Sequence, residues 1–181
     1  MITVEASNVR KTLSNHILAD GFEPVVDLEK SHGSWLVDGR DGREYLDLFT
    51  MFASIPVGYN HPKLLEHKED LAIASMNKPT NSDIYTTQLA QFVESFFTVT
   101  MPDIFKYGFF IEGGALAIEN ALKASFDWKV RKNYQKNGSA QEIGSKVIHF
   151  SNCFHGRTGY TISLTNTSDL RKTANFPKFD W

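Results

Sequence analysis

The sequence of 181 residues lacks several features that mark whole classes of protein. It has one cysteine, Cys153, so no disulfide can form within the chain, and we expect a reducing, cytoplasmic location. The formal net charge of -2 argues against a general nucleic-acid binder, because such a protein needs a basic face. No apolar run approaches the ~20 residues that span a bilayer, and no basic-then-apolar signal opens the chain, so we expect no membrane partner.

The chain does have enough apolar material for a core and a regular alternation of elements. Hydrophobic residues make up 41% of it and aromatic residues 13%, including 14 phenylalanines. Beyond about residue 60, short apolar strands alternate with helical patterns, which predicts an α/β fold with a doubly wound, mainly parallel sheet. Residues 1–60 predict a small α+β lobe instead, so we divide the chain into segments 1–60 and 61–181.

Periodicity and turn residues predict the individual elements. A hairpin is expected around the Gly39–Gly42 turn, and a strongly amphipathic helix over residues 86–99. A second helix is expected from Ala115 to about Lys132, supported by the pair Glu119 and Lys123 at helical spacing. Further predictions are strands at 109–111, 147–150 and 160–164, and a polar loop over 133–145.

The first chemical motif is the pair of glycines, Gly113 and Gly114, between the predicted strand 109–111 and the helix after it. Glycine allows a sharp turn, and the helix start presents unpaired N–H groups and a positive dipole end. This arrangement predicts a phosphate site formed by the backbone amides of Gly114 and Ala115. The glycine spacing excludes the ATP and dinucleotide fingerprints. The alternative is an ordinary strand-to-helix turn.

The second motif, Phe154-His155-Gly156-Arg157, follows the predicted strand 147–150. An aromatic side chain there can stack on a flat cofactor ring, and an arginine can bind a carboxylate through two parallel hydrogen bonds. Because both motifs follow strands of the expected sheet, we expect both at its carboxyl edge. Taken singly, such residues are as easily core or surface residues.

Together, the two motifs resemble those of the class III, fold-type I, pyridoxal-phosphate-dependent aminotransferases, and the resemblance covers nearly the whole chain. Many members of that family have Ser-Gly-Thr or Ser-Gly-Ser where this sequence has Gly113-Gly114-Ala115. The version found here is more similar to the branch of L-lysine 6-aminotransferases (lysine epsilon-aminotransferases). The segments that carry this resemblance are Asn77–Asp83, Glu112–Ala124, Phe126–Trp128, Phe154–Thr161, Ser163–Thr167 and Phe176–Trp181.

The resemblance implies how the cofactor, pyridoxal 5'-phosphate, would be held. Gly114 and Ala115 would bind its phosphate through backbone N–H groups, and Phe154 would stack on its ring. His155 would lie near the ring, without an assigned role in proton transfer. Since Ala115 has no hydroxyl, the site has one donor fewer than in relatives with threonine there.

The resemblance also implies the substrates and partners. Arg157 would bind the α-carboxylate of L-lysine and that of 2-oxoglutarate, while Phe52 would line the substrate channel. The ε-amino group of lysine would pass to 2-oxoglutarate, giving 2-amino-6-oxohexanoate (allysine) and L-glutamate. Family members are homodimers, and we assign no metal-binding residue.

The family also needs a Schiff-base lysine, but none of the 13 lysines of this chain stands in the family's context for it. We therefore assign no catalytic residue, and we expect an N-terminal fragment, truncated within its large-domain sheet and inactive alone. Segment 61–181 would be the first part of the cofactor-binding domain. The alternatives are specificity for ornithine or 4-aminobutyrate, a non-catalytic α/β module that binds a phosphate ligand, and a purely structural α/β domain.

Overall fold

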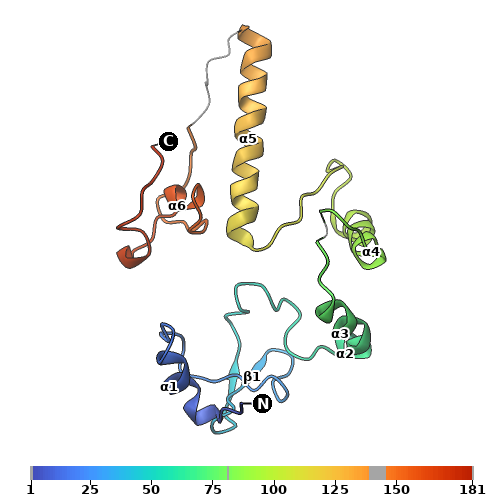
Figure 1. Cartoon of the computed structure of the whole chain (residues 1–181), viewed down its shortest axis with the longest axis vertical. Helices are drawn as coiled ribbons and strands as arrows, with labels where there is room; N and C mark the ends of the chain where they lie inside the picture. The colour runs from blue at the N-terminus through green and yellow to red at the C-terminus, as the bar shows by residue number, and fades with distance from the viewer. Residues whose placement is uncertain (1, 81, 139–145, 181) are drawn as a thin grey trace. The chain divides into compact units, whose positions relative to one another are not determined.

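The computed structural model of the chain describes residues 2–80, 82–138 and 146–180. They divide into two compact units, Met1–Glu94 and Ser95–Trp181, each described here by itself (Figure 1). The predicted boundary at residue 60 concerns the domains of the family's complete fold and stays a prediction. Within the described ranges, no helix is both long and apolar enough to cross a membrane.

The first unit contains a short antiparallel hairpin and a series of helices. Strand β1, Trp35–Val37, pairs with β2, Glu44–Leu46, so the hairpin predicted at the Gly39–Gly42 turn is confirmed. The register places Leu36 opposite Tyr45. The helical elements of this unit are η1 (Ala6–Asn8), α1 (Val9–Ser14), α2 (Pro62–Glu66), α3 (Lys68–Met76) and α4 (Thr87–Ser95).

A buried carboxylate holds the hairpin turn in place. Asp38 is 0% exposed, and its Oδ2 accepts a hydrogen bond of 2.7 Å from Arg40 Nη2. Its Oδ1 accepts from the backbone N–H groups of Val25 and Arg40 at 3.3 and 3.0 Å. The hydrogen-bonded Arg40 guanidinium holds the pKa of Asp38 well below its ordinary value, although burial acts in the opposite direction. The ionised form of Asp38 therefore stabilises the folded unit.

The second unit begins where the predicted helix over 86–99 changes its geometry. The α-helical part ends at Ser95, and η2, a π-helical turn, covers Phe96–Thr100 and is closed by a bond of 3.1 Å from Met101 N to Phe96 O. Such turns occur where one residue more is fitted into a helical segment. The remaining helical elements are α5 (Gly114–Asn137), α6 (Thr161–Leu164) and η3 (Leu170–Lys172).

Helix α5 begins one residue before its predicted start and continues beyond the predicted end at Lys132. It ends at Gly138, whose left-handed φ of 61° lets its N–H donate to Tyr134 O at 2.8 Å. The loop predicted for 133–145 is thus wrong for 133–137, because the glycine cap lies later than expected. Residues 139–145 of that predicted loop lie outside the described residues.

Two of the predicted strands, 109–111 and 147–150, form no strand in the structure. A strand needs a neighbour to pair its backbone groups, and the described residues supply none for either segment. Their apolar side chains are correspondingly uncovered: Phe109 is 72% exposed and Ile148 fully exposed.

The third predicted strand, 160–164, is also wrong, because Thr161–Leu164 forms helix α6. The backbone groups of this segment are satisfied locally. Ile162 N donates to Thr158 O at 2.9 Å, and the Thr161 hydroxyl accepts from Thr158 N at 3.0 Å. Local bonds of this kind compete with pairing between strands.

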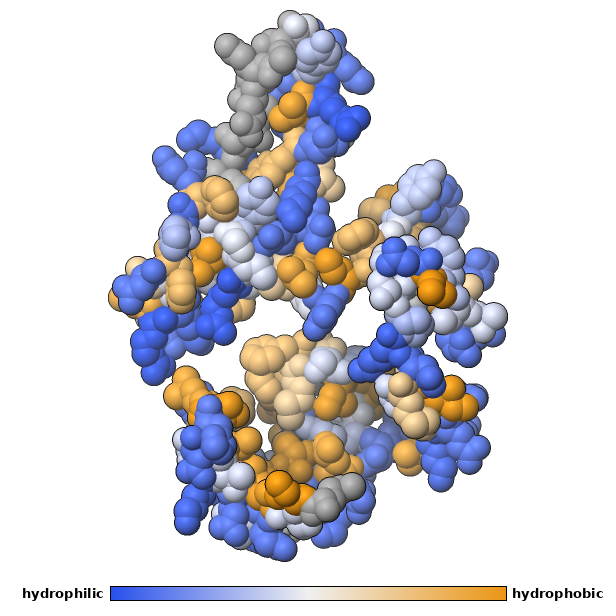
Figure 2. Space-filling model, viewed as in Figure 1, coloured by the Kyte–Doolittle hydropathy of each residue, from blue (hydrophilic) through white to orange (hydrophobic). Residues whose placement is uncertain are grey.

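Polar side chains share the buried positions of both units with apolar ones. The buried apolar side chains are Val37, Tyr59, Ile162 and Leu164, and the buried polar ones are Ser31, Asp38, Thr161, Thr165 and Thr173. Many large apolar side chains are exposed instead, and Figure 2 shows apolar patches on the surface of this view. Hydrogen-bonded polar groups therefore contribute strongly to the order of each unit.

Replacing Asp38 by asparagine should lower the midpoint of thermal unfolding by roughly 5 °C at neutral pH, because Arg40 loses its buried counter-charge. Since the pKa of Asp38 is depressed in the folded state, its contribution is present above the unfolded value of about 3.9 and is lost as the pH falls through the folded value. The difference between variant and wild type should therefore shrink in acid. Asp41→Asn, which alters an exposed partner of Arg43 in the same turn, is the matched control. Equal midpoints for all three proteins would contradict the role of Asp38.

Candidate functional site

The start of helix α5 presents unpaired backbone N–H groups beside open space. Gly113 precedes the helix with φ 79°, and the first helical hydrogen bond runs from Ala117 N to Gly113 O at 3.1 Å. In the described part of the chain, nothing accepts from the N–H groups of Gly114, Ala115 or Leu116. A Cβ added at Gly113 or Gly114 would meet no atom within 4 Å. Three free donors at the positive end of a 24-residue helix suit an anion such as phosphate.

The second motif packs directly on this helix start. Gly156 is buried, and a Cβ added to it would lie 2.4 Å from Ala115 Cβ and 2.9 Å from Ala115 Cα. Its φ of 117° is also one that residues with side chains rarely adopt. The two motifs, far apart in the sequence, therefore meet through a glycine that has no room for a side chain.

A second connection joins the two segments one helical turn further along α5. Tyr160 N donates to Glu119 Oε2 at 3.3 Å, and the Tyr160 ring lies edge-on to Phe126 at 6.1 Å between centroids. The ammonium group of Lys123 lies 5.9 Å from the centroid of the same ring. Figure 1 shows the segment that contains α6 running beside α5. The turn is thus attached to the helix at two levels.

The side chains of the second motif differ in exposure. Phe154 is 59% exposed, His155 is half-buried and Arg157 is exposed. Among the described residues, no carboxylate lies in an ion pair with Arg157, so its guanidinium can accept a carboxylate ligand. The turn that packs on the start of α5, with its three amide donors, thus carries an exposed aromatic side chain and, among the described residues, a guanidinium without an ion-pair partner. This combination suits one ligand that has an anionic group and a flat ring, together with a second molecule that has a carboxylate.

Two buried threonines, which the sequence pattern does not indicate, bond the backbone of this turn. Thr161 and Thr165 are 0% and 1% exposed, and their hydroxyls bond the backbone of residues 155–158. Glu119, predicted only as the partner of Lys123, also receives the N–H of Tyr160. A buried threonine gives no sequence signal that separates it from a threonine on the surface, so pattern alone could not have found these contacts.

Phe52, predicted to line a substrate channel, lies in the first unit rather than with the other candidates. It is 87% exposed, and its ring lies edge-on to Phe49 at 4.6 Å. Residues 50–53 all have left-handed φ values between 49° and 65°, which is uncommon for residues with side chains. Asp47 supports this turn by accepting from Thr50 N at 2.8 Å. The role of Phe52 stays a prediction.

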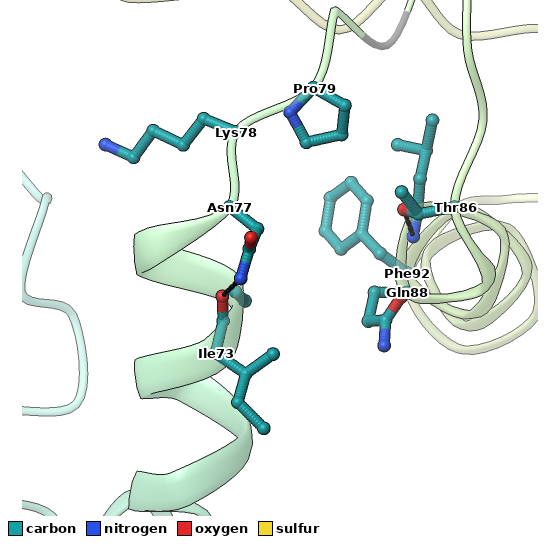
Figure 3. A pocket seen from close by; sticks show the side chains of 9 residues that line it. Ile73, Asn77, Lys78, Pro79, Thr86, Gln88 and Phe92 are labelled. Atoms are coloured by element: carbon teal, nitrogen blue, oxygen red, sulfur yellow. Dashed lines mark hydrogen bonds between the residues drawn. The ribbon is translucent and has the colours of Figure 1, made fainter.

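A pocket of about 590 Å³ lies between α3 and α4 in the first unit (Figure 3). Ile73, Pro79 and Phe92 line it, and Asn77 turns its amide back to donate to Ile73 O at 2.9 Å. None of the candidate residues lines it, and Lys78 is the one charged side chain among its described lining residues. We therefore place the candidate site at the start of α5 and not in this pocket.

Comparison with known proteins gives a consistent result over most of the chain. Residues 18–179 match the family "Aminotransferase class-III". The L-lysine-epsilon aminotransferase of Mycobacterium tuberculosis is 50% identical over 176 residues, which cover 96% of this chain. The 4-aminobutyrate aminotransferase of Mycosarcoma maydis is 32% identical and covers 87% of it.

A solved structure of the lysine aminotransferase from M. tuberculosis superimposes with a TM-score of 0.91 at 49% identity. The superposition covers 98% of this chain and 41% of that one. This chain spans 39% of the length of the lysine-epsilon aminotransferases that it matches. The α/β fold expected from the sequence is therefore shown for the part of the fold that the chain represents.

Replacing Gly156 by alanine should separate the two motifs, because the new methyl group would overlap Ala115 and strain a backbone at φ 117°. We expect a fall in the thermal unfolding midpoint of roughly 5 °C or more. Gly159→Ala is the matched control, since a Cβ there meets no atom within 4 Å. If the two variants unfolded at the same temperature, the packing of Gly156 on Ala115 would be wrong.

Proposed function

The chain belongs to the class III aminotransferases, and on that premise we propose that the complete enzyme transfers the ε-amino group of L-lysine to 2-oxoglutarate. The products are 2-amino-6-oxohexanoate and L-glutamate, and the cofactor is pyridoxal 5'-phosphate. The observation that carries the proposal is the contact of Gly156 with Ala115, because it joins an anion site to an aromatic face and an arginine. The choice of lysine is supported by 50% identity to lysine-epsilon aminotransferases, against 32% to a 4-aminobutyrate aminotransferase.

The residues at the start of α5 fit this cofactor. Among the described residues, nothing accepts from the N–H groups of Gly114 and Ala115, and a Cβ added at Gly114 would meet no atom within 4 Å, so these groups can donate to its phosphate. Phe154 is exposed enough to stack on its ring, and His155 lies next to Phe154 in the same turn. When bound, pyridoxal phosphate supplies an aldehyde that takes up the amino group and a ring that withdraws electrons from the reacting centre.

Arg157 provides the substrate side of the site. Its guanidinium can form two parallel hydrogen bonds with the α-carboxylate of lysine, and later with a carboxylate of 2-oxoglutarate. A lysine bound by its α-carboxylate directs its other end, the ε-amino group, toward the reacting centre. This orientation explains why the terminal amine would react rather than the α-amine. Phe52 is proposed to line the channel along the aliphatic part of the substrate.

The rest of the machinery is proposed for the complete enzyme. No lysine of this chain is assigned to the Schiff base, and the active enzyme is proposed to be a homodimer. The single thiol, Cys153, is unpaired and suits a reducing compartment, which supports a cytoplasmic location.

The amine donor is tested by expressing the complete coding sequence and measuring glutamate formation from 2-oxoglutarate. We expect kcat/KM for L-lysine to exceed that for L-ornithine by about 10- to 200-fold, since ornithine is one methylene shorter. 4-Aminobutyrate should be poorer still, because it is two methylenes shorter than lysine between its carboxylate and its amine. A preference for ornithine or 4-aminobutyrate would move the enzyme to another branch of the family. Cofactor binding without any transfer would favour a non-catalytic binding module.

Arg157→Lys in the complete enzyme should raise the KM for L-lysine and for 2-oxoglutarate by about 10- to 100-fold, since a hydrogen bond to a charged group contributes ~1.5–3 kcal/mol. The Kd for pyridoxal phosphate should stay within about threefold, because Arg157 is assigned to the substrate and not to the cofactor. Arg171→Lys is the control, as that arginine is exposed and paired with Asp169 at 2.9 Å. Unchanged substrate KM values in Arg157→Lys would reject the assigned role.

A further inference from the structure

One buried hydroxyl forms two hydrogen bonds with the turn that carries the candidate site residues. Thr165 is 1% exposed, and its Oγ1 accepts from His155 N at 3.0 Å and donates to Gly156 O at 2.6 Å. The first of these groups belongs to the peptide that joins Phe154 to His155, and the second to the peptide that joins Gly156 to Arg157. A hydroxyl has one proton to donate, and here the donor and an acceptor position are both used within the turn.

The position of Thr165 is itself fixed on both sides. The residue before it, Leu164, is 2% exposed, and its carbonyl oxygen lies 3.1 Å from Cys153 Sγ. The residue after it, Asn166, donates its N–H to Cys153 O at 2.9 Å. The neighbours of Thr165 are thus attached to Cys153, which lies at the start of the turn that the Thr165 hydroxyl bonds. Thr165 therefore has a fixed position relative to this turn.

The side chains of Phe154 and Arg157 have no comparable anchor of their own. Within the described residues, neither makes a hydrogen bond, an ion pair or a ring contact through its side chain. Their directions therefore depend on the backbone of the turn. That backbone includes Gly156, and glycine leaves the chain more conformational freedom than any other residue, so hydrogen bonds from outside the turn help to fix its conformation.

We propose that Thr165 is a positioning residue, which aims the ring of Phe154 at the cofactor and the guanidinium of Arg157 at the substrate carboxylate. The inference rests on the proposed function and adds to it a residue that touches neither ligand. Without the hydroxyl, the two peptide groups would remain buried and lose their partner, so the turn would shift. A displacement of about 1 Å in a site of this kind can cost a large factor in rate.

The test uses the complete enzyme with Thr165→Val, which keeps the shape of the side chain and removes the hydroxyl, and with Thr165→Ser, which restores the hydroxyl. Thr167→Val is the matched control, because that hydroxyl lies on the same segment and accepts from Asp169 N at 3.3 Å, outside the turn. For each protein, the Kd for pyridoxal phosphate is measured on the apoenzyme by fluorescence quenching. We would also measure the KM for L-lysine, the KM for 2-oxoglutarate and the midpoint of thermal unfolding of each protein.

We expect Thr165→Val to raise the cofactor Kd and both substrate KM values by about tenfold, and Thr165→Ser to stay within about threefold of wild type. Thr167→Val should match wild type in all three constants. A purely structural role for Thr165 would lower the unfolding midpoint and leave the constants of the folded enzyme unchanged, and that result would overturn the inference.

Should Thr165→Val fail to fold, Thr165→Cys provides the same comparison, since a thiol is only a weak donor and acceptor. Its constants should lie clearly above those of Thr165→Ser, and equality of the two would overturn the inference. The proposed function fails separately: a wild-type enzyme that binds no pyridoxal phosphate, or that does not use lysine, would reject that function. If the wild-type enzyme binds pyridoxal phosphate and uses lysine, and Thr165→Val has the same Kd and KM values, only the positioning role is rejected.

Discussion

The contact between Gly156 and Ala115 is the constraint on which the candidate site depends. It brings a turn and a helix start together at a separation that leaves no space for a side chain. On the helix side, the unpaired N–H groups of Gly114 and Ala115 remain open to an anion. On the turn side, Phe154 lies two residues before Gly156 and Arg157 directly after it. One close approach therefore determines how far the phosphate site lies from the ring and carboxylate sites.

Polar bonds rather than a large apolar core support this contact and the hairpin of the first unit. The hydroxyls of Thr161 and Thr165 hold the turn, as the carboxylate of Asp38 holds the hairpin, and all three side chains are almost fully buried. Apolar segments such as 104–111 and 147–150 are largely exposed in the chain. Under the proposed function, other parts of the complete enzyme would cover these segments, which agrees with a match to 39% of the length of its relatives.

Elements that depend on neighbouring residues in the sequence could be predicted from it. Elements that depend on contacts between residues far apart in the sequence could not. The Gly39–Gly42 hairpin and the start of α5 follow from turn residues and helical spacing, and both were predicted. Segment 160–164 contains residues that favour strands, such as Thr161 and Ile162, yet local bonds to Thr158 make Thr161–Leu164 a helix. The segments 109–111 and 147–150 have the composition of buried strands but no partner strand among the described residues. The candidate residues of the two motifs were found by pattern, whereas Thr165 shows its importance only through contacts in space.

If the two motifs form one site for pyridoxal phosphate, a crystal structure of the complete enzyme with that cofactor will show it. The phosphate oxygens should lie within about 3 Å of Gly114 N and Ala115 N, with the ring of Phe154 stacked on the pyridine ring. Gly156 should also pack on Ala115 as it does in this structure. A phosphate bound elsewhere, or a turn separated from the start of α5 by a side chain or by water, would contradict the account.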